Sequence, residues 1–226
     1  LRGTEPTAAT PFPAVDDDSV AAGALLAGDR DAFERTVDRL PVPPVSARWA
    51  AVLDAAVRQV GSHWWLDHAR AVRHHIAGEE AEAEAAYARS VEAHPTVPAL
   101  RGQAVVATGR GDLGAAAEHY ERARALDPTC RPLVTEQLDL LLAAGRPEAC
   151  LAVIEASPRA VREHGRTRLQ RARALAAAGD PEAADAILVD LEVEDLAEGD
   201  RAIGELWHEL HAGAAVPARL DFRMTD

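Results

Sequence analysis

The stretch that decides the fold is GDLGAAAEHYERARALDPTC, residues 111–130. Nearly the same order of glycine, alanines, tyrosine and proline stands earlier in the chain, as GEEAEAEAAYARSVEAHPTV at residues 78–97. Two unrelated helices would not share this order by accident. The chain therefore contains an internal period, and a period of this length predicts an array of repeated structural units.

The period extends over four copies. Glycines that follow alanine-rich runs recur at intervals of 33, 34 and 34 residues, namely Gly78, Gly111, Gly145 and Gly179. Three further positions keep their character relative to each glycine. Seven residues before it are Ala71, Ala104, Leu138 and Ala172; five after it are the small residues Ala83, Ala116, Cys150 and Ala184; nine after it are the larger Tyr87, Tyr120, Ile154 and Leu188.

Each repeated position has a physical reason. Small side chains allow two antiparallel helices to approach closely. A glycine can end the first helix in the left-handed conformation without steric cost. A proline, such as Pro128 in the second copy, stops the second helix and begins the next unit. One such helix pair cannot cover its apolar face alone, so the units are expected to stack.

These residues resemble the tetratricopeptide repeat, a helix–turn–helix unit of about 34 residues. The best match is residues 97–130, and the resemblance covers residues 62–197. The third and fourth copies lack the closing proline at its usual place. The resemblance implies an all-α fold, a right-handed superhelical array of antiparallel helix pairs with one concave surface.

The flanking segments differ from the repeats. Residues 1–17 predict a linker or extended segment, and 18–61 predict degenerate N-terminal helices with a turn at Gly28 and a helix at 46–60. Residues 198–213 predict a capping helix and 214–226 a C-terminal tail. The tail resembles the closing segment of large bacterial tetratricopeptide proteins that begin with an uncharacterised β-sandwich domain suspected of acting on sugars. We therefore expect the chain to be the C-terminal part of a larger protein, with Phe222 and Arg223 docked on a neighbouring domain.

Composition restricts the class of protein. The formal net charge is −13, and all 24 basic residues are arginine. Such a chain repels nucleic acids and anionic membranes, so neither is an expected partner. No apolar run approaches the roughly 18 residues of a membrane helix, and a cytoplasmic location is expected. Cys130 and Cys150 are expected to be reduced thiols, and a disulfide between them is the alternative.

Catalytic and metal-binding motifs are not evident in the sequence. His63, His68, His74 and His75 form the densest cluster, but their spacing does not bring side chains together on one helix turn, and no metal or cofactor is expected. The adjacent Trp64 and Trp65 predict packing against helix 46–60. No nucleophile motif or phosphate-binding loop stands in the right context, so this segment is not expected to be an enzyme.

The remaining candidate site is the concave groove. The resemblance implies that the fifth, ninth and twelfth places of each first helix line it. These places hold His68, Val72 and His75; Arg101, Val105 and Thr108; Thr135, Asp139 and Leu142; and Leu169, Arg173 and Ala176. The family's chaperone-binding members hold a peptide carboxylate with lysine and asparagine, and this chain has neither residue. If the groove takes an acidic or C-terminal peptide, Arg101 and Arg173 are the expected anchors.

The sequence thus predicts a non-catalytic helical-repeat scaffold that contacts a protein or peptide, or another domain of the same polypeptide. Two alternatives stay open. The groove could bind nothing or be filled by another part of the polypeptide, and the chain could be an accessory segment of a carbohydrate-active enzyme whose catalytic domain lies elsewhere.

Overall fold

The structure, a computed structural model, describes residues 23–24, 27–37, 47–193 and 201–221. Within these ranges all regular structure is helical and no strand occurs, which confirms the all-α prediction. No helix in the described ranges has both the length and the apolarity needed to cross a membrane. The predicted linker at 1–17 and the residues Phe222 and Arg223 lie outside the described residues. The chain forms two compact units, residues 1–95 and 96–226, which are described separately.

The N-terminal unit contains four helices in the described residues: α2 (Arg30–Thr36), α3 (Ala47–Val60), α4 (Trp64–Ile76) and α5 (Glu80–Ala93). Its core joins Phe33 of α2, Leu53 of α3, and Trp65 and Leu66 of α4, all almost fully buried. Trp64 packs against the same cluster, so both tryptophans lie where the sequence predicts, beside α3. Gly28 has the positive φ expected of a turn, and Asp29 follows it as the N-cap of α2.

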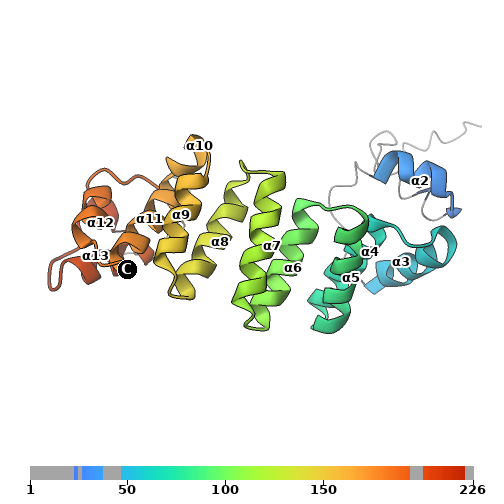
Figure 1. Cartoon of the computed structure of the whole chain (residues 1–226). Coiled ribbons are helices and arrows are strands. Elements are labelled where there is room, and N and C mark those ends of the chain that lie inside the picture. Colours follow the sequence, from blue (N-terminus) through green and yellow to red (C-terminus); the bar gives the residue numbers. More distant parts are fainter. Residues whose placement is uncertain (1–22, 25–26, 38–46, 194–200, 222–226) are drawn as a thin grey trace, which may run out of the picture. The chain divides into compact units, whose positions relative to one another are not determined.

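The C-terminal unit is a series of consecutive helix pairs (Figure 1). Its elements are α6 (Val97–Gly109), α7 (Leu113–Leu126), α8 (Arg131–Ala143), α9 (Pro147–Ala156), α10 (Arg159–Arg162), α11 (Gly165–Ala177), α12 (Pro181–Leu188), α13 (Ala202–Leu210) and the short 3-10 helix η2 (Ala218–Leu220). The pairs are α6 with α7, α8 with α9, and α11 with α12, and they repeat the pairing of α4 with α5. We call α4, α6, α8 and α11 the first helices and their partners the second helices.

The four period glycines end the first helices in the same way. Each has a positive φ, between 63° and 87°. In α6 the amide of Gly111 donates to the carbonyl of Thr108 (3.0 Å), and that of Asp112 donates to Ala107 (2.9 Å). These two backbone hydrogen bonds together form the Schellman motif. The other three glycines make the same pair of bonds, so one local geometry closes all four first helices.

The other three repeated positions form the interior of the pairs. All twelve residues that share the period are buried, and none is more than 5% exposed. In the second pair, where α6 packs against α7, Ala104 and Ala116 have no exposed surface and Tyr120 is only 5% exposed. The alanines are small because close-packed backbones leave no room for more.

The third pair departs from the regular unit. The second helices α5 and α7 end 15 residues after the period glycine, but α9 ends 11 residues after it, at Ala156. Pro158 then starts the one-turn helix α10, and His164 precedes α11. A side chain at Gly165 is excluded, because an added Cβ would lie 2.1 Å from the carbonyl oxygen of Glu192. The segment after α12 therefore crosses the start of α11 at backbone contact.

The last pair is covered by α13 and part of the tail. Ile203 and Leu206 of α13 are almost fully buried against α11 and α12. Leu220 in η2 is only 1% exposed and joins the same cluster. Arg219 donates a hydrogen bond to the carbonyl of Leu188, the last residue of α12 (2.9 Å). The described part of the tail thus covers the last pair.

Candidate functional site

His68 and His75, two of the three groove residues predicted in the N-terminal unit, do not form an open site. The His68 ring is only 7% exposed and lies beside the Tyr87 ring, with 5.8 Å between centroids. Burial lowers the pKa of His68 to about 4, so the ring is neutral at physiological pH. His75 is partly buried, and its Nδ1 has no hydrogen-bond partner in the described part of the chain.

The neighbouring histidines have structural contacts of their own. His63 caps α4 by accepting a hydrogen bond from the amide of Trp65 (3.2 Å), and its ring meets Phe33 edge-on. His74 pairs with Glu79. Among the described residues, no three His, Cys, Asp or Glu side chains converge as they would around a metal ion. Both cysteines are free thiols, and burial raises the pKa of Cys150 to about 12.

In the C-terminal unit, the predicted anchor Arg101 is paired with Glu136. Arg101 lies on α6 and Glu136 on α8, and both guanidinium bonds to the carboxylate measure 2.7 Å. The hydroxyl of Tyr120 on α7 donates to the same carboxylate (3.3 Å). Burial, assisted by the charge of Glu136, raises the pKa of Tyr120 to about 12. Three helices therefore meet at one carboxylate, and the Arg101 guanidinium is held by it.

Two further predicted groove residues, Asp139 and Arg173, belong to a second polar bridge. Gln170 of α11 donates a hydrogen bond to the Asp139 carboxylate of α8. Arg173 contacts both, donating to the side-chain oxygen Oε1 of Gln170 at 3.0 Å and lying 3.8 Å from the Asp139 carboxylate. Burial raises the pKa of Asp139, and the charge of Arg173 partly offsets this effect. This bridge links two consecutive first helices.

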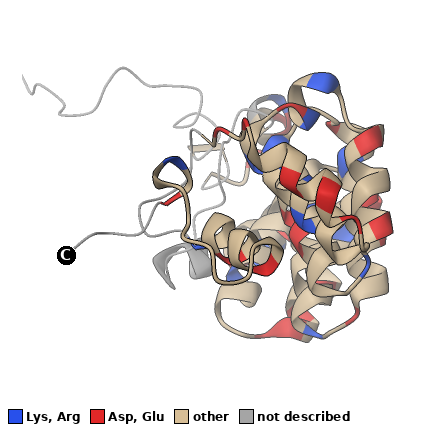
Figure 2. Ribbon diagram, turned by 90° about the vertical axis from the view of Figure 1, so that its left-hand side faces the viewer, with Lys and Arg blue, Asp and Glu red and all other residues tan. Residues whose placement is uncertain are grey.

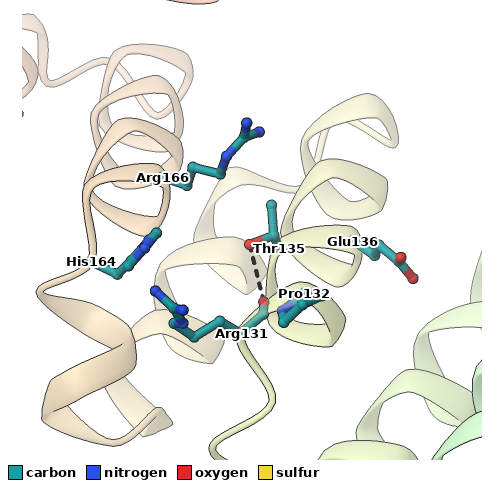
Figure 3. A pocket seen from close by; sticks show the side chains of 6 residues that line it. All are labelled: Arg131, Pro132, Thr135, Glu136, His164 and Arg166. Atoms are coloured by element: carbon teal, nitrogen blue, oxygen red, sulfur yellow. Dashed lines mark hydrogen bonds between the residues drawn. The ribbon is translucent and has the colours of Figure 1, made fainter. Parts of the chain in front are cut away.

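A pocket of about 310 Å³ lies on one side of this bridge, between the beginnings of α8 and α11 (Figure 3). We call it the basic pocket. Its lining residues are Arg131, Pro132, Thr135, Glu136, His164 and Arg166. Figure 3 shows the Arg131 side chain reaching from α8 toward His164, while Glu136 points away from both. Because the carboxylate of Glu136 is occupied by Arg101, arginine charge prevails in this pocket.

A second pocket of about 440 Å³ lies on the other side of the bridge, and we call it the acidic pocket. Asp139 and Arg173 form part of its wall, with Leu142 and Ala143 of α8 and Ala177 of α11. The capping helix α13 supplies the rest, namely Ala202, Glu205, Leu206 and Glu209. Three carboxylates thus face one guanidinium. The pocket exists because α13 packs beside α11.

Charge elsewhere on the molecule is mixed. Figure 2 shows acidic residues spread over the helices, with arginines between them. The chain as a whole carries −13. The basic pocket is therefore locally positive on a chain whose net charge is negative. The acidic pocket is locally negative, like the chain as a whole.

Sequence reasoning placed Thr135, Asp139, Leu142 and Arg173 at the groove, and these four residues do line the two pockets. It did not find the first-turn residues Arg131, His164 and Arg166, nor the contribution of α13. A signal for the arginines was available, since both stand in the first turn of a first helix in consecutive units. No comparable signal marked Glu205 and Glu209, because the capping helix lies outside the period.

The sequence matches no protein-family model and no curated protein. The fold and the two pockets are therefore the basis on which a function is assigned.

Proposed function

We propose that this chain is a non-catalytic helical-repeat scaffold of the tetratricopeptide kind, which binds a segment of a partner protein, or of another domain of the same polypeptide, along the first helices of its C-terminal unit. One observation carries the proposal. Both pockets are lined by the first helices α8 and α11, the residue before α11 and the capping helix, and neither is lined by a second helix. Two neighbouring hollows on the same pair of first helices suit a segment that lies across them.

The polar bridges between the first helices support a preformed surface. Arg101–Glu136 and Asp139–Gln170 connect α6 to α8 and α8 to α11 through side chains that sit on this side of the unit. Side chains that are already held in place lose little conformational entropy when a partner binds. We place the protein in the cytoplasm, where its two free thiols would stay reduced.

A peptide selection with site-directed crosslinking tests the proposal. Random peptides displayed on phage are selected against the full chain, and enriched peptides are then incubated with two variants that carry the photo-crosslinker p-benzoylphenylalanine. One replaces Thr135 in the basic pocket, and the other replaces Glu118, an exposed residue of the second helix α7. The proposal expects crosslinking at position 135 and little at 118. The reverse pattern, or no enrichment over an unselected library, would contradict it.

A further inference from the structure

The two pockets lie at opposite ends of the same two helices. The basic pocket is lined by Arg131 and Arg166, in the first turns of α8 and α11, and the acidic pocket by Ala143 and Ala177, their last residues. A helix carries partial positive charge at its N-terminus and partial negative charge at its C-terminus. Side-chain charge and backbone dipole therefore have the same sign at each end, and this surface is electrostatically polarised.

Charged side chains at both ends are available for a ligand. Within the described residues Arg131 makes no ion pair, and neither do Glu205 and Glu209 of the acidic pocket. The carboxylate that would otherwise neutralise the basic pocket, Glu136, is bound in bidentate fashion by Arg101. Arg166 also acts on Asp139, whose pKa it helps to lower against the effect of burial.

The distance between the two ends suits a short extended peptide. Arg131 and Asp139 are eight residues apart on α8, which at 1.5 Å per residue is about 12 Å along the helix. An extended chain advances about 3.3 Å per residue, so side chains four residues apart are separated by about 13 Å. Side chains of an extended segment alternate between two faces, so residues four apart point to the same side.

We infer that the segment bound along α8 and α11 is an extended peptide with an aspartate or glutamate four residues from an arginine or lysine. Its carboxylate occupies the basic pocket at Arg131, and its cation occupies the near edge of the acidic pocket at Asp139, where Glu205 and Glu209 add negative charge. Between them the peptide runs beside α8 toward the Asp139–Gln170 bridge. This inference rests on the proposed function and adds to it the chemistry of the partner.

The same polarity explains which partners would be rejected. A wholly acidic segment would meet the carboxylates of the acidic pocket, and a wholly basic one would meet Arg131. Unpaired like charges brought together in this way oppose binding, which gives specificity by repulsion as well as by attraction. A carboxylate held by a guanidinium forms charge-assisted hydrogen bonds, which are stronger than neutral ones.

Nuclear magnetic resonance titration of the ¹⁵N-labelled full chain tests the inference, because it locates weak binding by residue. The probes are the blocked peptides Glu-Thr-Val-Thr-Arg and Arg-Thr-Val-Thr-Glu, which cover both chain directions. Control peptides replace the glutamate or the arginine with glutamine, or place the two charges side by side. One of the two probes should perturb amides of both pockets and bind about fivefold more tightly than any control.

Protein variants assign each charge to its pocket. Arg131→Gln should abolish the preference for glutamate over glutamine in the peptide and leave the preference for arginine. Glu205→Gln with Glu209→Gln should do the opposite. Arg122→Gln and Glu148→Gln, exposed residues of the second helices α7 and α9, are the matched controls and should change neither preference.

Two results would overturn the inference. The first is no perturbation of either pocket at roughly 5 mM peptide, a concentration that detects millimolar affinity. The second is binding whose strength is the same for the probes and for their glutamine controls, or is unchanged by Arg131→Gln. If phage-selected peptides still crosslink at position 135 but need no charge, only the charge rule fails and the proposed function stands.

Discussion

Arg101 on α6 and Glu136 on α8 form a bidentate ion pair, with Nε 2.7 Å from Oε2 and Nη2 2.7 Å from Oε1. The pair joins two consecutive first helices, 35 residues apart in the sequence. It also has a consequence for the basic pocket. By binding Glu136, Arg101 leaves the positive charge of Arg131 without an opposing carboxylate among the residues that line this pocket.

The Arg101–Glu136 pair should contribute a small, measurable coupling to stability. Both side chains are partly exposed, and pairs of this kind are worth up to about 1 kcal/mol. In a double-mutant cycle of Arg101→Ala and Glu136→Gln, measured by urea unfolding, we expect a coupling of about 0.5–1 kcal/mol. A control cycle uses Arg146→Ala in place of Arg101→Ala. Arg146 is an exposed arginine in the turn after α8, and no coupling with Glu136→Gln is expected. A coupling of zero for the first pair would show that the contact is energetically silent.

Gly165→Ala should destabilise the C-terminal unit. The new Cβ would lie 2.1 Å from the carbonyl oxygen of Glu192 and 2.8 Å from the Cα of Val193, so the segment after α12 would have to move. Overpacking of this kind costs about 1–3 kcal/mol. The same substitution at Gly204 in α13 meets no atom closer than 4.0 Å and should be neutral or stabilising. Equal thermal midpoints for the two variants would contradict the close approach at Gly165.

Ala116→Val should push α6 and α7 apart. Ala116 has no exposed surface and lies on α7, which packs against α6. Two added methyl groups have no space there, so we expect a loss of about 1–3 kcal/mol in the free energy of unfolding. Ala125→Val, on an exposed position of the same helix, controls for the lower helix propensity of valine and should cost less than about 0.7 kcal/mol. A cost at Ala116 no greater than at Ala125 would mean that the interior of the pair is loosely packed.

Leu220→Ala should weaken the end of the C-terminal unit. Leu220 is 1% exposed within the cluster formed by α11, α12 and α13, and truncating a buried leucine costs about 2–4 kcal/mol. Leu126, which is 51% exposed at the end of α7, offers a matched control whose truncation should cost far less. Hydrogen exchange at the amides of α12 would locate the effect. Unchanged protection there would show that η2 does not stabilise the last pair.

His68 should make the N-terminal unit sensitive to acid. Burial lowers its folded-state pKa to about 4, while the unfolded chain has the ordinary value of 6.5. As the pH falls, the unfolded chain therefore binds a proton at His68 before the folded chain does. The stability gained from the neutral, buried His68 is complete above pH 6.5 and is lost as the pH falls toward 4. Between pH 7.5 and pH 5 the loss amounts to about 2 kcal/mol. His68→Gln does not titrate, so its unfolding free energy should fall by about 2 kcal/mol less than that of the wild type over the same interval. Parallel pH profiles would contradict the burial of a neutral imidazole.

Much of the local structure could be predicted from the sequence. The glycines at 78, 111, 145 and 179 marked where first helices end, and all four adopt the left-handed conformation there. The residues five and nine positions after them are buried in the pairs. These features could be predicted from the sequence because a helix end and a helix–helix contact depend on residues within about one period of each other. Each of the four repeated units therefore specifies the same helix-pair geometry by its own residues.

The candidate site depended on the tertiary structure. The resemblance to the tetratricopeptide repeat placed Arg101 and Asp139 in the groove, but it did not show that Glu136 would bind Arg101 or that Gln170 would bind Asp139. Such pairs depend on how successive helix pairs are rotated and shifted. The shortened α9 and the added α10 bring His164 to the basic pocket, and α13, which lies outside the period, completes the acidic one. The sequence by itself determined the repeated helix pair, because near-neighbour bonds and small buried residues define it. Only the packing of one pair on the next decided where opposite charges would be left unpaired, since that contact joins side chains about 35 residues apart.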